Sequence, residues 1–184
     1  MTESPAPAPA LADADADGIA TVHELIKGQR TAMLTTHHAD GSIVTRPMAC
    51  QEAEFDGSLW FFAFSDSQKV AHIQADPRVN VAFTQEGAWV SLTGTAEVVH
   101  DEAKARELWN PFAKAWFQCE PEDPKVALIR VDSTAAEYWD APGKPAQLIS
   151  TLKAVVTGSR PDDGGNATVQ FLSLIHISEP TRPY

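Results

Sequence analysis

The chain has 184 residues, a formal net charge of −11, 43% hydrophobic residues and two cysteines. This length and apolar content suit one domain with a single core, and no apolar run approaches the ~20 residues that a membrane-spanning helix needs. The acidic balance argues against nucleic acid as a partner, because phosphate backbones are bound by clustered Lys and Arg. Cys50 and Cys119 form no CxxC motif, so neither a zinc site nor a disulfide framework is indicated. A cytoplasmic location without a signal peptide is expected.

Two low-complexity stretches open the chain. Residues 5–9 alternate Pro and Ala, and residues 12–17 alternate Ala and Asp. Because such segments bury little apolar surface, they predict a disordered arm over residues 1–17. A helix capped by Asp17 is predicted next, and its apolar residues share one face: Ile19, Val22, Leu25 and Ile26.

From Thr31 onward the apolar residues recur with the period of strands, not helices. Strands are predicted at residues 31–36, 43–50, 58–64, 79–84, 88–99 and 126–131. Asp-Gly and Glu-Gly pairs mark several of the turns between them. Helices are predicted at residues 67–75, 101–109 and 146–157, and prolines end the first two. Most strands are not followed by a helix, so the pattern favours an antiparallel barrel over a doubly wound sheet.

One arginine and one lysine stand at positions suited to an anion. Arg46 precedes a proline near the end of a predicted strand, and Lys69 lies in the first turn of a predicted helix, just after Ser65, Asp66 and Ser67. A helix N-terminus offers free backbone N–H groups and the positive end of the macrodipole. With Arg46 and Lys69 added, it would suit one phosphate group. In the plainer interpretation, Ser65, Asp66 or Ser67 only caps the helix and Lys69 is a solvated charge.

Other candidate sites are weaker. His37 and His38 border a turn, and neighbours on a strand face opposite ways, which disfavours a shared metal ion. The two cysteines have no base nearby in sequence, so a nucleophilic role is not indicated. The sequence has no GxGxxG after a strand and no GxxxxGK[ST], the two commonest nucleotide-binding motifs.

Taken in order, several motifs resemble the FMN-binding split-barrel family, and most closely its general stress protein branch, related to pyridoxamine 5′-phosphate oxidase. They span roughly residues 18–158 and read Arg46-Pro47-Met48, Leu59-Trp60-Phe61-Phe62, Lys69-Val70, Asp76-Pro77-Arg78-Val79-Asn80-Val81, Val90-Ser91-Leu92-Thr93-Gly94-Thr95-Ala96, Ala115-Trp116-Phe117 and Glu137-Tyr138-Trp139-Asp140. The resemblance implies a mainly β (α+β) fold: a six-stranded antiparallel split β-barrel with short peripheral helices. It also implies FMN as the cofactor and a homodimer with the flavin at its interface.

The resemblance further implies which residues contact the cofactor. Trp139 would reach the flavin of the partner subunit. Gln68 stands where the oxidase has an arginine, and Trp89 where it has a flavin-contacting glutamine, so this chain departs from the oxidase at both positions. The implied cofactor-binding residues are Arg46, Pro47, Met48, Phe62, Ala63, Ser67, Gln68, Lys69, Trp89 and Trp139.

The segments outside the domain have their own interpretations. The folded domain is placed at residues 18–158, and residues 159–171, rich in Asp, Gly and Pro at their start, read as a flexible tail. Residues 172–184 resemble the in-frame translation of a sequencing adapter and are set aside as an artefact. The alternative is a genuine short strand and loop.

Three functional hypotheses stand at this point. The first is an FMN-binding general stress protein, with low-specificity flavin-dependent oxidoreductase activity as its enzymatic form. The second is a flavin-binding sensor or storage module without turnover. The third is a split-barrel binder of deazaflavin or haem, which the acidic balance and the lack of a suitable axial histidine disfavour.

The segment after Trp139 predicts that pyridoxamine 5′-phosphate is not a substrate. The oxidases follow this tryptophan with arginines and a histidine that bind the substrate phosphate, whereas residues 142–149 contain Lys144 as their only cation. Lysine lacks the bidentate fork of arginine, so we expect no pyridoxal phosphate to form when FMN-saturated protein is incubated with the substrate in air. Turnover in the usual enzymatic range of about 1–10³ s⁻¹ would contradict this interpretation.

Overall fold

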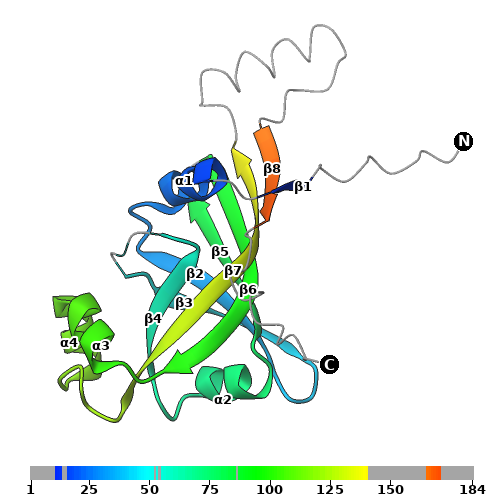
Figure 1. Cartoon of the computed structure of the whole chain (residues 1–184). Coiled ribbons are helices and arrows are strands. Elements are labelled where there is room, and N and C mark those ends of the chain that lie inside the picture. The colour runs from blue at the N-terminus through cyan, green and yellow to red at the C-terminus, as the bar shows by residue number, and fades with distance from the viewer. Residues whose placement is uncertain are drawn as a thin grey trace, which may run out of the picture.

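The computed structural model describes residues 11–13, 16–51, 53, 55–85, 87–140 and 165–170. Six antiparallel strands curl into a split barrel (Figure 1), which confirms the fold predicted from the resemblance. They are β2 (Thr31–His37), β3 (Ile43–Ala49), β4 (Ser58–Phe64), β5 (Arg78–Gln85), β6 (Ala88–Val99) and β7 (Val126–Asp140). The order along the sheet is β7-β6-β5-β2-β3, and β4 pairs with the other side of β7. No pairing between β3 and β4 is present in the described residues, so the barrel is split between them.

Four short helices surround the barrel: α1 (Ala16–Ile26), α2 (Gln68–Ala75), α3 (Glu102–Leu108) and α4 (Pro111–Phe117). Helix α1 packs against β5 and β6, and α2 packs against β2 and β6. The β2–β3 hairpin and α2 lie at the same end of the barrel (Figure 1). None of the helices that the structure describes is long and apolar enough to cross a bilayer.

Two apolar clusters form the core. Alternate residues of the strands point inward, as period-2 patterning requires, so that β2 buries Ala32, Leu34 and Thr36. Val22 and Ile26 of α1 belong to this main cluster. A second cluster lies under α3 and α4 and contains Phe62, Ala105, Leu108, Ala113, Val126 and Leu128.

Helix α4 was not predicted as a separate element. Pro111 was expected to end a helix, and it also begins one, because the fixed φ of proline suits the first helical position. The Asn110 side chain caps this helix by accepting a hydrogen bond from the Ala113 N–H at 2.9 Å. The 101–109 helix is found as α3, with Asp101 as its N-cap.

Strand β7 continues to Asp140, whereas the predicted strand ends at Val131. The extension is rich in small and polar residues, so its strand conformation comes from pairing with β6, which is irregular between Thr93 and Gly94. Gly94 is required there, because a Cβ atom at this position would overlap the backbone carbonyl of Asp132.

Strands also occur in both segments that the sequence analysis left without regular structure. Strand β8 (Gly165–Gln170) runs antiparallel to β7, and β1 (Leu11–Asp13) runs parallel to β8. β4 pairs with β7 only over residues 126–132, so the backbone groups of residues 135–140 on the same edge of β7 need another partner. β8 supplies their hydrogen bonds. The predicted helix at residues 146–157 and the segment 172–184 lie outside the described residues.

Gly94→Ala tests the irregular pairing of β6 with β7. The added methyl group meets backbone, which no rotamer change can relieve, so we expect the free energy of unfolding to fall by about 3 kcal/mol or more. Gly28→Ala is the matched control. Gly28 has φ +76° but open space around it, so only left-handed strain of about 1–2 kcal/mol is expected. Urea denaturation measures both; equal costs would show that Gly94 is not sterically required.

Candidate anion-binding site

The site lies where the side chain of Arg46, on β3, comes close to helix α2. The chain leaves β4, turns through Ser65 and Asp66, and enters α2 after Ser67, the N-cap residue. The Ser67 side chain makes no capping hydrogen bond, and its Oγ is buried without a partner in the structure. The plain interpretation of Ser67 as a helix cap is therefore wrong for its hydroxyl group, which is left available to another acceptor or donor.

Arg46 extends from β3 over the inner face of the sheet. It shares that face with the buried Met48, and its Nη1 donates a 2.8 Å hydrogen bond to Oγ1 of Thr36 on β2. Burial lowers the pKa of Arg46 from its usual value, although a guanidinium remains charged at any physiological pH. One donor of the guanidinium is thus anchored inside the protein.

Lys69, in the first turn of α2, is close enough to Arg46 for their charges to interact. Burial and the neighbouring Arg46 guanidinium both lower the pKa of Lys69. Among the described residues neither cation forms an ion pair with a carboxylate, whereas Arg78, Arg106 and Arg130 all do. Two adjacent, partly buried and uncompensated cations in a protein of net charge −11 mark a local site for an anion.

The structure divides the predicted cofactor residues into separate groups. Arg46 and Lys69 lie close enough for their charges to interact, and Ser67 is the N-cap residue of the helix that carries Lys69. Met48, Phe62 and Ala63 are buried in the core, while Pro47 and Gln68 are exposed.

Trp89 and Trp139 form a second group on the outer face of the sheet. They are directly opposite each other on β6 and β7, 47% and 42% exposed. Trp89 alternates along its strand with Ala88 and Val90, which are buried, so it points away from the inner face that carries Arg46. Three strand pairings separate β3 from β6. Within one chain, the tryptophans and the cation pair therefore do not meet.

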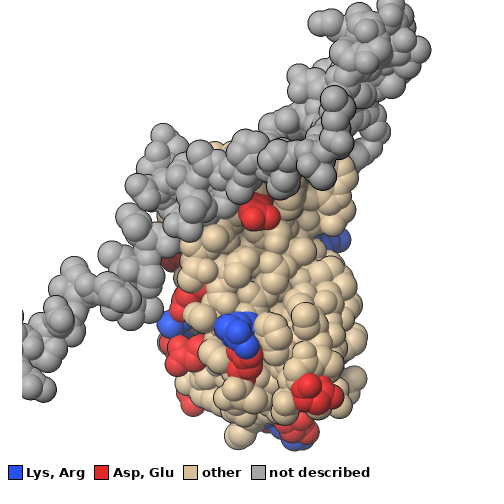
Figure 2. Space-filling model, turned by 90° about the vertical axis from the view of Figure 1, so that its right-hand side faces the viewer, with Lys and Arg blue, Asp and Glu red and all other residues tan. Residues whose placement is uncertain are grey.

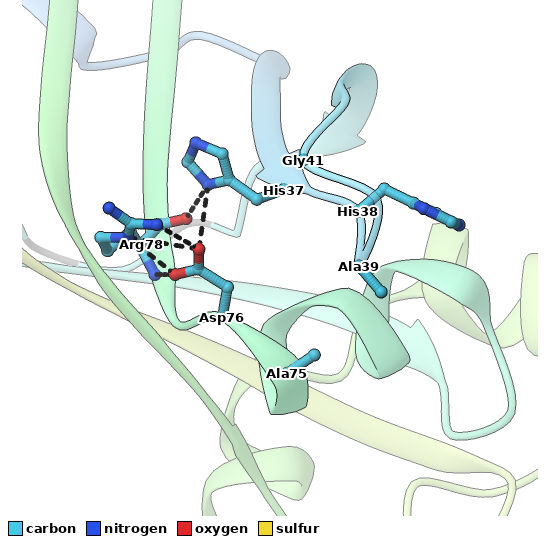
Figure 3. Close-up of a pocket in the computed structure, with 7 residues that line it drawn as sticks. All are labelled: His37, His38, Ala39, Gly41, Ala75, Asp76 and Arg78. Carbon is cyan, nitrogen blue, oxygen red and sulfur yellow. Dashed lines mark hydrogen bonds and ion pairs between the residues drawn. The ribbon is translucent and has the colours of Figure 1, made fainter.

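A shallow hollow nearby is a weaker candidate (Figure 3). Asp76 and Arg78 bind each other there through an ion pair of 2.6 Å, and His37 Nδ1 lies 3.8 Å from the Asp76 carboxylate. The hydrogen bonds from Arg78 hold the pKa of Asp76 well below its usual range. Because these polar groups already satisfy one another, the hollow offers less to a ligand than the Arg46–Lys69 pair does. It is lined by His37, His38, Ala39, Gly41, Ala75, Asp76 and Arg78.

Metal and thiol chemistry find no support in the part of the chain that the structure describes. No group of three or more His, Cys, Asp or Glu side chains there could hold a metal ion. Burial raises the pKa of the Cys50 thiol to about 11. Since the thiolate is the nucleophilic form, Cys50 is poorly suited to attack a substrate.

Comparison with known proteins agrees with this fold. The family model described as pyridoxamine 5′-phosphate oxidase like matches residues 17–162. The chain belongs to this family. Among curated proteins, protein bli-3 of Neurospora crassa is 32% identical over 132 residues, which cover 65% of this chain and 63% of that protein. The chain thus spans less than two thirds of this curated relative.

Two solved structures place the chain near the general stress proteins. A Jannaschia sp. CCS1 protein, provisionally named general stress protein 26, is 28% identical with a TM-score of 0.69, covering 85% of this chain and 100% of that one. The general stress FMN/FAD binding protein of Xanthomonas citri is 31% identical with a TM-score of 0.58, covering 66% of this chain and 87% of that one. The predicted family resemblance is confirmed.

Sequence reasoning missed two side chains of the site, Thr36 and His72. Thr36 is fully buried, and its Oγ1 lies 3.0 Å from Nδ1 of His72 on α2. Both positions carried a weak signal. Thr36 is a polar residue at an inward position of β2, and His72 follows Lys69 by three residues, which puts both on one helix face.

Lys69→Met tests whether the cation pair is uncompensated. Methionine keeps most of the aliphatic length while removing a partly buried charge next to Arg46. We expect the ligand-free protein to gain a few tenths to about 1 kcal/mol in free energy of unfolding, measured by urea denaturation. Lys27→Met is the control, because Lys27 is exposed and paired with Glu24 at 3.2 Å, and should give no gain. A clear loss of stability in Lys69→Met would reveal a favourable partner for Lys69.

Proposed function

We propose that this protein binds FMN, and that Arg46, Ser67 and Lys69 hold its phosphate. The observation that carries the proposal is the pair of uncompensated cations beside the unpartnered Ser67 hydroxyl. A phosphate monoester carries about −1.5 to −2 charges at neutral pH and three strong acceptor oxygens. It would therefore accept hydrogen bonds from all three side chains and neutralise the repulsion between Arg46 and Lys69.

The start of α2 suits the same phosphate. Helix N-termini present backbone N–H groups and a positive partial charge to an anion, and Gln68 and Lys69 are the first residues of this helix. Gln68 adds no charge of its own, so fewer charged groups are available than at the corresponding oxidase site. We expect FMN binding that depends strongly on the two remaining cations.

The flavin group, rather than a protein side chain, would supply the redox chemistry. The residues of this chain would bind the phosphate, orient the ring and limit access of water. Two relatives support this proposal by their names, since both are called general stress proteins and one is called an FMN/FAD binding protein. Steady-state oxidation of NADH or NADPH by FMN-loaded protein separates a flavin-dependent oxidoreductase from a sensor or storage protein.

The phosphate contacts can be tested by comparing two ligands. A charge-assisted hydrogen bond contributes roughly 1.5–3 kcal/mol, so Lys69→Ala should weaken FMN binding about 10- to 150-fold, and Arg46→Ala should act in the same direction. Riboflavin lacks the phosphate and should be affected far less. Fluorescence titration measures both ligands. If both variants bind FMN as tightly as the parent, the phosphate is bound elsewhere.

We further propose that the protein is a homodimer with the flavin at its interface. The cations and the Trp89–Trp139 pair lie on opposite faces of one sheet, so a single FMN can contact both only if the tryptophans come from a second copy. The outer face also exposes Met33, at 40%. Figure 2 shows the right-hand side of the molecule as drawn in Figure 1, where most of the visible charged side chains lie on the lower part and uncharged surface lies between and beside them.

Sedimentation velocity tests the dimer. We expect a dimer at micromolar concentration with FMN bound, because a ligand that binds only the dimer stabilises it. Trp139→Arg should weaken the dimer and FMN binding together, whereas Trp116→Arg, on α4 at a position 66% exposed, should leave both unchanged. A monomer that is fully loaded with FMN would refute the proposed interface.

A further inference from the structure

A chain of buried hydrogen bonds lies directly behind the cation pair. It joins three elements: Arg46 of β3, Thr36 of β2 and His72 of α2. Thr36 is 0% exposed and His72 is 8% exposed, and both rank among the few buried polar residues of the described chain. Buried polar groups of this kind are retained only where their hydrogen bonds are satisfied.

Chemistry fixes the direction of the first hydrogen bond, and the second depends on the tautomer of His72. A guanidinium can only donate, so Arg46 Nη1 donates to Thr36 Oγ1 at 2.8 Å. The Thr36 hydroxyl has a single hydrogen of its own, and His72 Nδ1 lies 3.0 Å from its oxygen. Donation of that hydrogen to Nδ1 requires His72 to be the neutral ring with its hydrogen on Nε2, and we adopt this tautomer.

The charges around His72 agree with a neutral ring. Arg46 faces it from β3, and His38 and Asp40 face it from the β2–β3 turn; the His38 ring packs edge-on with centroids 4.9 Å apart. Lys69 lies one turn earlier on the same helix. Burial, then Arg46 and His38, lower the pKa of His72, and Asp40 opposes them.

From this geometry we infer that Thr36 and His72 are positioning residues, which fix Arg46 in the orientation that receives the phosphate. The inference rests on the proposed function and extends it to residues behind the ligand. One guanidinium N–H of Arg46 donates to Thr36, and this hydrogen bond limits rotation of the arginine side chain. The other N–H groups stay free to donate to the anion. Holding that donor in advance reduces the entropy lost when the phosphate binds.

The acceptor atom Nδ1 of His72 orients the Thr36 hydroxyl group, and through it the Arg46 guanidinium. With Nδ1 accepting, the Thr36 hydroxyl must turn its lone pairs toward Arg46. Without an acceptor on α2, the hydroxyl can rotate and donate elsewhere, and the Arg46 orientation is no longer defined. The effect of either residue should therefore appear in phosphate recognition and not in contacts to the flavin ring.

Variants at both positions test the inference in the full chain, with FMN and riboflavin as probes. Thr36→Val removes the hydroxyl at nearly constant volume and should weaken FMN roughly tenfold, as expected for one hydrogen bond to a charged group. Riboflavin affinity should stay within about twofold. Thr36→Ser should restore most of the FMN affinity. His72→Leu should act like Thr36→Val, while His72→Asn, which keeps an acceptor near the Nδ1 position, should act like Thr36→Ser.

Nitrogen-15 NMR of the His72 ring gives a readout that needs no ligand. We expect Nδ1 to be unprotonated and Nε2 to carry the hydrogen at neutral pH in the parent. A hydrogen on Nδ1 would overturn the inference, because the Thr36 hydroxyl would then not be donating to His72. Circular dichroism and thermal unfolding establish that each variant is folded. If Thr36→Val or His72→Leu disrupts folding, Thr36→Ser, His72→Asn and the NMR measurement on the parent still test the inference.

The outcomes separate the inference from the function on which it rests. If the parent binds FMN no more tightly than riboflavin, the phosphate site is wrong and both proposals fail. If the parent prefers FMN, and folded Thr36→Val and His72→Leu keep the same preference, only the positioning role fails. A loss of preference in these two variants, with recovery in Thr36→Ser and His72→Asn, supports it.

Discussion

The hydrogen bond from Arg46 to Thr36 ties the candidate site to the barrel. β3 is an edge strand, paired only with β2 among the described strands, and a long arginine at such an edge would ordinarily sample solvent. Here its guanidinium reaches over the inner face and binds a hydroxyl that is fully buried. The bond fixes this charge without neutralising it. Lys69 on α2 therefore lies next to an arginine whose guanidinium is already held in place by Thr36.

The cation pair has an energetic cost that the fold must offset. Burial lowers the pKa of Arg46, and burial together with the Arg46 guanidinium lowers the pKa of Lys69. No carboxylate among the described residues pairs with either cation. The protein has acidic residues in excess, and it uses several of them to pair Arg78, Arg106 and Arg130 instead. Functional sites commonly keep such unfavourable arrangements because a ligand completes them. The net charge of the whole chain therefore does not indicate this local pair of cations.

Local patterns in the sequence were enough to predict most of the barrel, because strands such as β2 and β6 alternate buried and more exposed residues, and recognisable turns separate the strands. They were not enough for β7 beyond Val131, where pairing with β6 and β8 determines the structure. The same limit applied to the site. Arg46 and Lys69 were found because cations near a strand end and a helix start suggest anion binding. Thr36 and His72 were missed, because their role depends on a contact between β2 and α2, and the two residues are 36 positions apart in the sequence.

The phosphate-binding residues and the tryptophans lie on opposite faces of the sheet, so they should contribute to the free energy of FMN binding in different ways. In the proposed dimer, phosphate recognition by Arg46, Ser67 and Lys69 occurs within one chain, whereas Trp139 contributes to the ring only through the subunit contact. Substitutions at the phosphate end should then lower the affinity for FMN without altering the residues of the subunit contact, so that the dimer loses only the stabilisation that bound FMN provides. Substitutions at the tryptophan end change the contact and the affinity together. The two ends do not touch within a chain, so their effects should add in double variants unless the bound cofactor itself transmits a shift between them.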